Sequence, residues 1–214
     1  MKKGLFITFE GIDGCGKSTQ LSRVAKNLAD QGFSIVTTRE PGGTDIAEKI
    51  REILISPDNN AMVNECEILL YCAARAQHVR ERIIPAIEQG KIVLCDRFQE
   101  ATFAYQGFGR AISIDMLTML NSYATGGLNP DRTFIFDLSV HESFVRLEKM
   151  NKAKDRLESS GIDFFERIRE GYLSMAKKYP QRIQLVDGTQ SVENISATVI
   201  SSIIEVAKKY GNLN

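Results

Sequence analysis

The stretch FEGIDGCGKSTQ, residues 9–20, decides the fold class of this chain. Residues 11–18 match the pattern G-x-x-x-x-G-K-[ST], after an apolar run at 5–9 and at the start of a segment of helical period. Glycines let backbone N–H groups converge on phosphate oxygens at such a turn, and the positive end of the following helix adds to the attraction. A plain glycine turn is the alternative, but the strand-loop-helix context favours a phosphate-binding loop.

The polar side chains of this loop have expected roles in holding a nucleoside triphosphate. Lys17 is expected to bridge the β- and γ-phosphate oxygens, and Ser18 to bind Mg²⁺. Asp96 closes an apolar strand beside the loop, where a carboxylate can hold Mg²⁺ directly or through water; its alternatives are a partner for Arg97 or a helix cap. The expected ATP-binding residues are Gly11, Ile12, Asp13, Gly14, Cys15, Gly16, Lys17, Ser18 and Thr19.

Beyond the loop, short apolar runs alternate with longer segments of helical period. The runs of strand length are 5–9, 34–38, 91–95, 132–138 and 182–186. The helical segments are 16–31, 44–55, 64–89 with a bend or break at Pro85, 98–106, 113–124, 140–150, 162–178 and 191–209. Apolar strands separated by helices predict a doubly wound α/β fold, with a parallel sheet covered on both faces. At 214 residues, a single domain over 1–214 is expected.

The composition limits the kinds of partner. Lys plus Arg and Asp plus Glu both number 27, so the formal net charge is zero, without the basic excess of many nucleic-acid binders. The apolar run near the N-terminus stops at Glu10, and no stretch approaches the ~18 apolar residues of a membrane helix. The four cysteines, which form no CxxC pair, are Cys15, Cys66, Cys72 and Cys95. We expect a cytoplasmic protein with reduced thiols that binds neither a nucleic acid polymer nor a membrane.

A phosphate-binding loop identifies nucleotide binding only, so other features must separate the protein classes. A GTPase switch needs an N-K-x-D motif, and NKAKD at 151–155 is one residue too long. A large ATP-driven machine needs coupled domains, for which 214 residues leave no room. A kinase for a small acceptor remains. Arg39 and Arg97 follow two predicted strands, at carboxyl ends where open α/β sheets bind ligands, so both can reach one acceptor phosphate; ordinary salt bridges are the alternative.

Four segments together resemble the signature segments of thymidylate kinases, in order and at that family's spacing. They are FEGIDGCGKSTQ, TREPGGT (38–44), LLYCAARAQH (69–78) and DRFQEATFAYQG (96–107). The resemblance implies a three-layer P-loop nucleoside monophosphate kinase fold with a central five-stranded sheet and a short mobile lid. It also implies transfer of the ATP γ-phosphate to dTMP, giving dTDP for dTTP biosynthesis, with Mg²⁺ and usually in a homodimer. The alternatives are a nucleotide-binding protein of this fold with weak or lost turnover, and a kinase for another nucleoside monophosphate.

The resemblance also assigns residues to the acceptor. Asp13 takes the position of a carboxylate that contacts the sugar 3′-hydroxyl and Arg97. Arg75 takes the position that recognises thymine, and Tyr105 the position that crowds the 2′-carbon and disfavours ribonucleotides. Tyr71 precedes Arg75 by one helical turn, so it lies on the same face and can stack on a base. The expected dTMP-binding residues are Asp13, Arg39, Tyr71, Arg75, Arg97, Thr102, Tyr105 and Gln106.

The sequence departs from the family pattern where the transferred phosphate is expected. Position 15 is Cys15, so the loop has no arginine, and the bacterial type of this family supplies that charge from a mobile lid. The polar segment at about 148–161 is the expected lid; a solvated surface loop is the alternative. Lysine lacks the forked geometry of arginine, so we expect Arg156, then Arg146, to contact this phosphate, with Lys149, Lys152 and Lys154 left open. The expected catalytic residues are Lys17, Arg97, Asp13, Arg156 and Arg146.

Two more departures from the family pattern and two expectations about packing remain. Ala101 stands where a serine is common in the family, and Tyr71 stands where phenylalanine is common. Met116 and Met119 are expected in the core. The helices near 64–89 and 98–124 carry more apolar positions than one core-facing stripe needs, which fits either a helical interface or deep burial.

Overall fold

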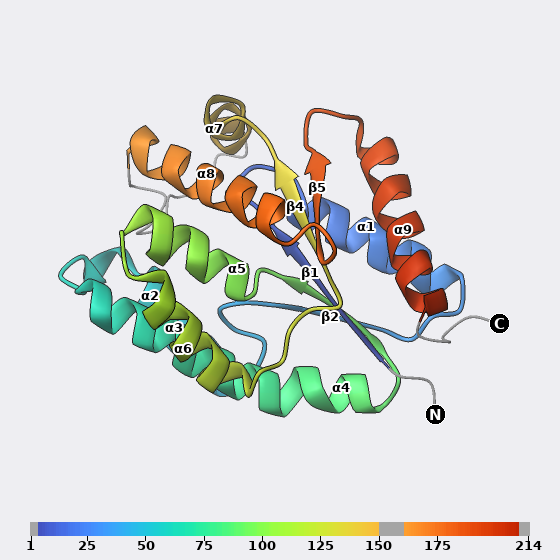
Figure 1. The fold of residues 1–214 in the computed structure, drawn as a ribbon, viewed down its shortest axis with the longest axis horizontal. Coiled ribbons are helices and arrows are strands. Elements are labelled where there is room, and N and C mark those ends of the chain that lie inside the picture. Colours follow the sequence, from blue (N-terminus) through green and yellow to red (C-terminus); the bar gives the residue numbers. More distant parts are fainter. Residues whose placement is uncertain (1–3, 150–160, 210–214) are drawn as a thin grey trace.

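The structure, a computed structural model, describes residues 4–149 and 161–209. Its centre is a parallel sheet of five strands in the order β2-β3-β1-β4-β5 (Figure 1). The strands are β1 (Leu5–Glu10), β2 (Ile35–Arg39), β3 (Ile92–Asp96), β4 (Arg132–Asp137) and β5 (Ile183–Asp187). Each strand coincides within one residue at either end with an apolar run, so the predicted parallel α/β sheet is confirmed.

The helices also follow the predicted segments closely. They are α1 (Lys17–Asp30), α2 (Asp45–Ile55), α3 (Asn64–His78), α4 (Ile84–Glu88), α5 (Gln99–Thr102), α6 (Ile114–Thr125), α7 (Val140–Lys149), α8 (Ile162–Lys178) and α9 (Val192–Lys209). A short 3₁₀ turn, η1 (Pro57–Asn59), and two π-helical segments, η2 (Val79–Ile83) and η3 (Phe103–Gly109), complete the helical elements. The interruption expected at Pro85 is the π-helical turn η2, which directly precedes α4.

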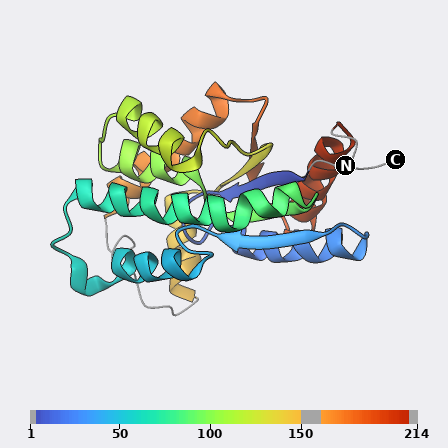
Figure 2. The same cartoon turned by 90° about the horizontal axis from the view of Figure 1, so that it is seen from below.

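Helices cover both faces of the sheet. On β1, Leu5, Ile7 and Phe9 belong to the apolar cluster that includes buried residues of α1 and α9, whereas Phe6 packs with Val79 of η2 in a separate cluster. Successive side chains of a strand point to opposite faces, so this division means that β1 is buried on both. Figure 2 shows the α3-η2-α4 rod running along the molecule beside α6. The predicted three-layer arrangement is confirmed.

The carboxyl ends of three strands bring the predicted site segments to one edge of the sheet. β1 leads into the phosphate loop and lies between β3 and β4. In the strand register, Asp96 of β3 stands opposite both Phe9 of β1 and Arg39 of β2. The chain runs from β1 past the place of β3 to β2, returns to β3, and then crosses β1 to reach β4, so the direction of strand addition reverses at β1. Ligands of open α/β sheets bind at such a switch point.

One expectation from the sequence was wrong, and another falls mostly outside the described residues. Met116 and Met119 of α6 are 51% and 65% exposed, so their expected place in the core was wrong; Leu117 between them is the buried side chain of this turn. The predicted lid begins at the end of α7, and most of it, with Lys152, Lys154 and Arg156, falls in 150–160, outside the described residues. None of the helices that the structure describes is both long and apolar enough to cross a membrane.

Candidate active site

The phosphate loop joins β1 to α1 and places free backbone N–H groups at the helix start. Gly16 is the N-cap of α1, in the left-handed region with φ 96°, and it offers no side chain to the first N–H groups of the helix. Those groups have no acceptor within the helix, which leaves them available to an anion. Gly14, with φ +82°, packs so closely on α7 that an added Cβ would lie 2.5 Å from the Ser143 carbonyl oxygen. The loop shape therefore requires glycine at position 14.

Asp13, the acid inside this loop, is held between two cations. Its Oδ1 lies 2.8 Å from Nη2 of Arg97 and 3.3 Å from Nζ of Lys17, and its Oδ2 accepts from the Tyr105 hydroxyl at 3.2 Å. Burial disfavours the carboxylate, but the charges of Arg97 and Lys17 outweigh burial and hold the pKa of Asp13 well below its usual range. The contact expected between Asp13 and Arg97 is present, and Asp13 stays ionised next to an anion site.

Arg97 connects the loop to the acceptor side. It is a non-glycine residue in the left-handed region, with φ 71°, directly after β3. Its Nη1 donates to the Gly11 carbonyl at 3.1 Å and to the Tyr172 hydroxyl at 3.3 Å, while Nη2 also donates to the Tyr105 hydroxyl at 3.0 Å. Its guanidinium carbon lies 4.9 Å from the centre of the Tyr105 ring. Unfavourable backbone geometry of this kind is typical of functional sites and is kept by the surrounding contacts.

Glu10, the last residue of β1, is a buried carboxyl group next to the residues that surround Arg97. The sequence alone gave it no role beyond ending a strand. Its Oε1 accepts the Phe98 N–H at 2.7 Å, and its Oε2 accepts the Tyr172 hydroxyl at 2.9 Å. Burial, reinforced by the nearby Glu100 carboxylate, raises the pKa of Glu10 to about 8. Glu10 and Tyr172 thus form a buried chain of hydrogen bonds behind Arg97.

An acceptor pocket opens beside the loop, between α2, α3 and the α5-η3 segment. Its lining residues are Asp13, Glu40, Pro41, Arg51, Ile55, Tyr71, Arg75, Arg97, Phe98, Ala101, Thr102, Tyr105 and Gln106. Helical spacing explains why Tyr71 and Arg75 lie together, because they stand at i and i+4 of α3. Thr102 ends α5, and Tyr105 and Gln106 follow in the π-helical segment η3. The structure therefore brings together every expected dTMP-binding residue except Arg39.

Arg39 lies in a second cleft, on the β2 side of the loop. Its Nη2 is 2.7 Å from Oε2 of Glu48, and its side chain is 53% exposed. This cleft is also lined by Ser18 and Asp96. In this structure Arg39 makes an ordinary salt bridge, which the sequence analysis gave as the alternative to binding the acceptor phosphate.

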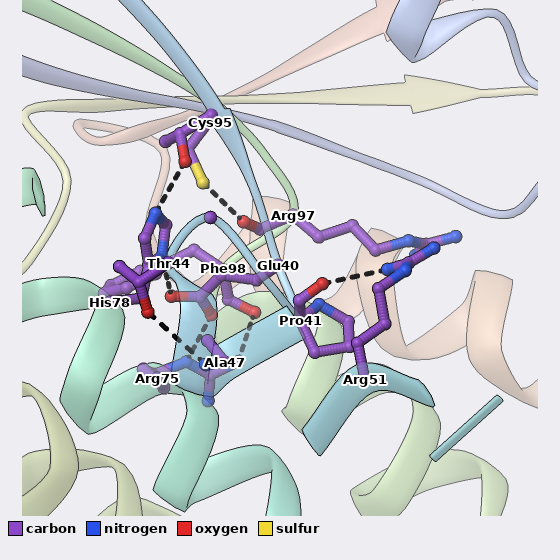
Figure 3. A network of polar contacts seen from close by, with 12 residues as sticks. Glu40, Pro41, Thr44, Ala47, Arg51, Arg75, His78, Cys95, Arg97 and Phe98 are labelled. Carbon is purple, nitrogen blue, oxygen red and sulfur yellow. Dashed lines mark hydrogen bonds and ion pairs between the residues drawn. The ribbon is translucent and has the colours of Figure 1, made fainter. Parts of the chain in front are cut away.

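Arg51 is the cation of the acceptor pocket that the sequence did not reveal. It lies on α2, one turn before Ile55, and its Nη1 donates to the Pro41 carbonyl at 2.9 Å. Figure 3 shows its guanidinium end turned toward that of Arg97. Burial, and then the positive charge of Arg39, lower the pKa of Arg51, while the charge of Glu48 opposes this shift. In the described part of the chain no carboxylate forms an ion pair with Arg51, because Glu48 pairs with Arg39. Of these two converging cations only Arg97 has a carboxylate in an ion pair, so the pair keeps a net positive charge that favours a bound anion.

Arg75 is fixed at the other end of the pocket (Figure 3). Nε donates to Oε2 of Glu40 at 2.7 Å, Nη1 donates to Oγ1 of Thr102 at 2.9 Å and to Oδ1 of Asn121, and Nη2 donates to the Phe98 carbonyl at 3.0 Å. An arginine has five N–H donors, so one N–H on Nη2 has no acceptor among the residues that the structure describes. Because Arg75 lines the pocket, this N–H is available to a ligand there.

Glu40 forms an ion pair with Arg75 and so fixes its position. The sequence motifs had assigned no role to Glu40. Its Oε1 lies 2.9 Å from Nδ1 of His78, whose Nε2 lies 2.6 Å from Oγ1 of Thr38. Burial opposes ionisation of Glu40, but the charge of Arg75 and the contact with His78 outweigh burial and lower its pKa. Because a carboxylate only accepts hydrogen bonds, Nδ1 of His78 carries the proton in this contact.

Ser18 and Asp96 form the pair expected to hold a metal ion. The Ser18 hydroxyl donates to Oδ2 of Asp96 at 2.5 Å, at the start of α1 and the end of β3. The described residues contain no group of three or more His, Cys, Asp and Glu side chains suited to a metal. Mg²⁺ is usually held by one or two carboxylates together with water and substrate phosphates, so a hydroxyl and a carboxylate beside a phosphate loop fit this ion.

Comparison with known proteins gives the family. The model of the family described as thymidylate kinase matches residues 9–199. The chain belongs to the thymidylate kinase family. A curated thymidylate kinase from an Exiguobacterium species is 47% identical over 97% of this chain and 98% of its own length, and one from Geobacter sulfurreducens is 46% identical over 94% and 96%. A crystal structure of thymidylate kinase from Ehrlichia chaffeensis superimposes with a TM-score of 0.77 at 32% identity, covering 94% of this chain and 99% of that one.

Membership of the thymidylate kinase family confirms the resemblance drawn from the four sequence segments, and with it the kinase class and the P-loop nucleoside monophosphate kinase fold. Of the basic residues expected near the transferred phosphate, the structure describes some and leaves others outside its described ranges. Arg146 of α7 donates from Nη2 to the Gly188 carbonyl at 3.1 Å, and a Cβ built on Gly16 would lie 3.9 Å from its Nη1. Arg146 thus lies beside the phosphate loop. Cys15 is buried, and burial raises the pKa of its thiol, so it adds no charge there.

Proposed function

We propose that this member of the thymidylate kinase family transfers the γ-phosphate of ATP to dTMP, forming dTDP for dTTP synthesis and releasing ADP. The observation that carries the proposal is the acceptor pocket itself, which opens beside the phosphate loop and joins a recognition end at Arg75 to a cationic end at Arg97. A phosphate oxygen of dTMP attacks the γ-phosphorus of ATP, and the bond between that phosphorus and the β,γ-bridging oxygen breaks. Positioning and charge supply most of the catalysis in such transfers.

The donor side uses the loop that begins α1. Backbone N–H groups of the loop and Nζ of Lys17 hold the β- and γ-phosphate oxygens of ATP. Ser18 and Asp96, already in contact, provide the oxygen ligands for Mg²⁺. Bound Mg²⁺ would neutralise charge that builds up on the β- and γ-phosphate oxygens.

The acceptor phosphate is bound by the cations at the loop end of the pocket. Arg97 and Arg51 converge there, and Arg39 is a third cation, held by Glu48 in the adjoining cleft. Lys17, Arg97 and Asp13 are the catalytic residues within the described part, because Asp13 orients both cations. Arg146 stands beside the loop, and Arg156, in the segment outside the described residues, remains the proposed lid residue for the transferred phosphate.

The nucleoside of dTMP occupies the rest of the pocket. The spare N–H of Arg75 donates to a carbonyl of thymine, with Thr102 and Gln106 nearby, and Tyr71 stacks on the base. The Tyr105 hydroxyl is bonded to Asp13 and Arg97, so its ring is fixed where a 2′-hydroxyl would have to fit. This arrangement disfavours a ribonucleotide. Asp13 also accepts from the sugar 3′-hydroxyl.

A coupled assay of ADP release with ATP, Mg²⁺ and a panel of nucleoside monophosphates tests the activity. We expect the highest kcat/KM with dTMP. A protein that binds ATP and dTMP but releases no ADP would show the nucleotide-binding class without turnover, and a preference for another acceptor would show a different monophosphate kinase. Either result would overturn the proposal.

The protein is proposed to act as a cytoplasmic homodimer whose chain forms one domain over 1–214. Apolar side chains on the outside of α6 and α3 support the dimer: Tyr123 is 91% exposed, Met119 65% and Leu69 57%. The two helices pack against each other, so an interface that covers one can extend over the other. Sedimentation should give the mass of a dimer for the wild type, and Met119→Lys with Tyr123→Lys should give a monomer; a wild-type monomer would exclude this interface.

A further inference from the structure

A buried contact behind the acceptor pocket joins Gln106 of η3 to Glu67 of α3. Nε2 of Gln106 donates to Oε1 of Glu67 at 2.9 Å, and the two residues are only 2% and 1% exposed. They are 39 positions apart in the chain, so the contact depends on the packing of η3 against α3. Gln106 lines the pocket, whereas Glu67 does not.

The chemistry of this contact fixes which way the Gln106 amide points. A glutamine amide has two donors on nitrogen and an acceptor on oxygen, while an ionised carboxylate only accepts. Arg110 supports the ionised form of Glu67, since its Nη2 lies 3.2 Å from Oε2 and its Nε 3.4 Å from Oε1. The nitrogen of the Gln106 amide must therefore face Glu67. The opposite orientation would bring an amide oxygen against a carboxylate oxygen.

The oxygen of the same amide is open to the pocket. Among the described residues, no donor reaches Oε1 of Gln106. In the part of the chain that the structure describes, the buried side-chain atoms without a hydrogen-bond partner are Glu100 Oε2, Arg132 Nε and Ser143 Oγ. Gln106 Oε1 is not among these buried atoms. The Gln106 oxygen therefore has no partner and is not fully buried. Because Gln106 lines the pocket, a ligand in the pocket can reach this oxygen. Together with the spare N–H of Arg75, the pocket offers one acceptor and one donor.

We propose that Glu67 is a positioning residue for base selection, which keeps the Gln106 oxygen aimed at the base. The inference rests on the proposed function and deepens it. Thymine presents an N–H at N3 beside a carbonyl at C4, which matches an acceptor beside a donor. Cytosine presents an unprotonated N3 beside an amine, so its N3 would face the Gln106 oxygen without a proton. Leaving a buried polar group unsatisfied in this way weakens the binding of that base.

Glu67→Gln tests the inference, because it keeps the size of the side chain but can donate as well as accept. The Gln106 amide then has no fixed orientation. We expect the ratio of kcat/KM for dTMP to that for dCMP to fall by roughly tenfold, the effect of one unsatisfied polar group. The ratio of dTMP to dUMP should not change, since uracil has the same N–H and carbonyl. A dTMP to dCMP ratio equal to that of the wild type would overturn the inference.

A double-mutant cycle separates positioning from a general structural effect. In a Gln106→Ala background, Glu67→Gln should leave the dTMP to dCMP ratio unchanged, because the residue through which Glu67 acts is absent. A further fall of the ratio in that background would show that Glu67 acts by another route. Glu67→Asp against Glu67→Asn repeats the comparison with shorter side chains, and equal ratios for these two would also contradict the inference.

The same panel distinguishes failure of the inference from failure of the proposed function. If the wild type does not prefer dTMP to dCMP, the proposed acceptor is wrong. If the wild type prefers dTMP and Glu67→Gln keeps that preference, only the role of Glu67 is wrong.

Discussion

Replacing Glu40 by glutamine should destabilise the protein far more than an ordinary loss of an ion pair. Glu40 and Arg75 are paired at 2.7 Å with side chains only 3% and 2% exposed, and the remaining acceptors of Arg75 are neutral. Glu40→Gln leaves the Arg75 charge buried without a counter-charge. Breaking a buried pair in this way costs about 3–5 kcal/mol, which corresponds to a fall in melting temperature of roughly 10 °C for a chain of this size.

A matched control exists on the surface of the same protein. Glu193 forms an ion pair with Arg23 at 3.0 Å, with side chains 66% and 47% exposed. Glu193→Gln makes the same chemical change where solvent screens the charge, so we expect a loss below about 1 kcal/mol. Thermal unfolding followed by circular dichroism compares the two variants at equal ionic strength.

The pH dependence gives the Glu40 prediction a second readout. The pKa of Glu40 is lowered in the folded protein, so the stability from its pairing is present above the unfolded value of 4.5 and is lost as the pH falls through the folded value. The gap between wild type and Glu40→Gln should therefore shrink in acid. The Michaelis constant for dTMP should also rise more than that for ATP, because Arg75 loses its orientation. A Glu40→Gln protein as stable at neutral pH as Glu193→Gln would refute the reasoning.

Three other substitutions test separate parts of the site. Lys17→Ala should lower kcat by roughly 10²-fold or more while the circular dichroism spectrum stays native, and unchanged turnover would remove Lys17 from the phosphate site. Asp96→Asn should raise the Mg²⁺ concentration needed for half-maximal rate, and an unchanged magnesium titration would count against the metal pair. Glu10→Gln should flatten the stability curve between pH 4.5 and about 8, where folded Glu10 keeps a proton that the unfolded chain releases. That proton stabilises the fold fully below pH 4.5, and this stabilisation is lost by about pH 8. Urea unfolding of the wild type should therefore show a free energy of unfolding that falls by roughly 1–1.5 kcal/mol per pH unit across this range. An equal slope in Glu10→Gln would contradict the raised pKa of Glu10.

Local patterns were enough to predict the elements of the fold. The strands are apolar on both faces, and the helices between them begin and end near the residues expected from their periodicity. The phosphate loop was predictable because its glycines, Lys17 and Ser18 are consecutive in the chain. Tyr71 and Arg75 could be placed together because helical spacing alone puts them on one face.

The partners of the site residues could not be predicted in the same way. Glu40 and Arg75 are 35 positions apart, and Asp13 and Arg97 are 84 apart, so their pairing depends on how whole elements pack. Arg51 lies on an amphipathic helix, where a charged residue is ordinary, and only the packing of α2 beside α3 turns it into the pocket. Asp13 and Arg97 were joined in advance only by family resemblance, whereas nothing in the sequence connected Arg51 with a ligand.

For the proposed acceptor, we infer that the distribution of carboxylates in the pocket orients the nucleotide more strongly than the number of arginines does. At the base end, Arg75 is neutralised by Glu40, and beside the sugar, Arg97 is neutralised by Asp13. Arg51 forms no ion pair among the described residues. Burial and the charge of Arg39 lower its pKa, and the nearby charge of Glu48 offsets only part of this effect. A phosphate dianion bound between Arg51 and Arg97 relieves that repulsion, whereas a phosphate at the opposite end would lie against the ionised Glu40. A neutral base edge can bind at Arg75 without a net charge of its own. We therefore infer that the pocket binds a nucleoside monophosphate in one direction only, with its phosphate toward the phosphate loop.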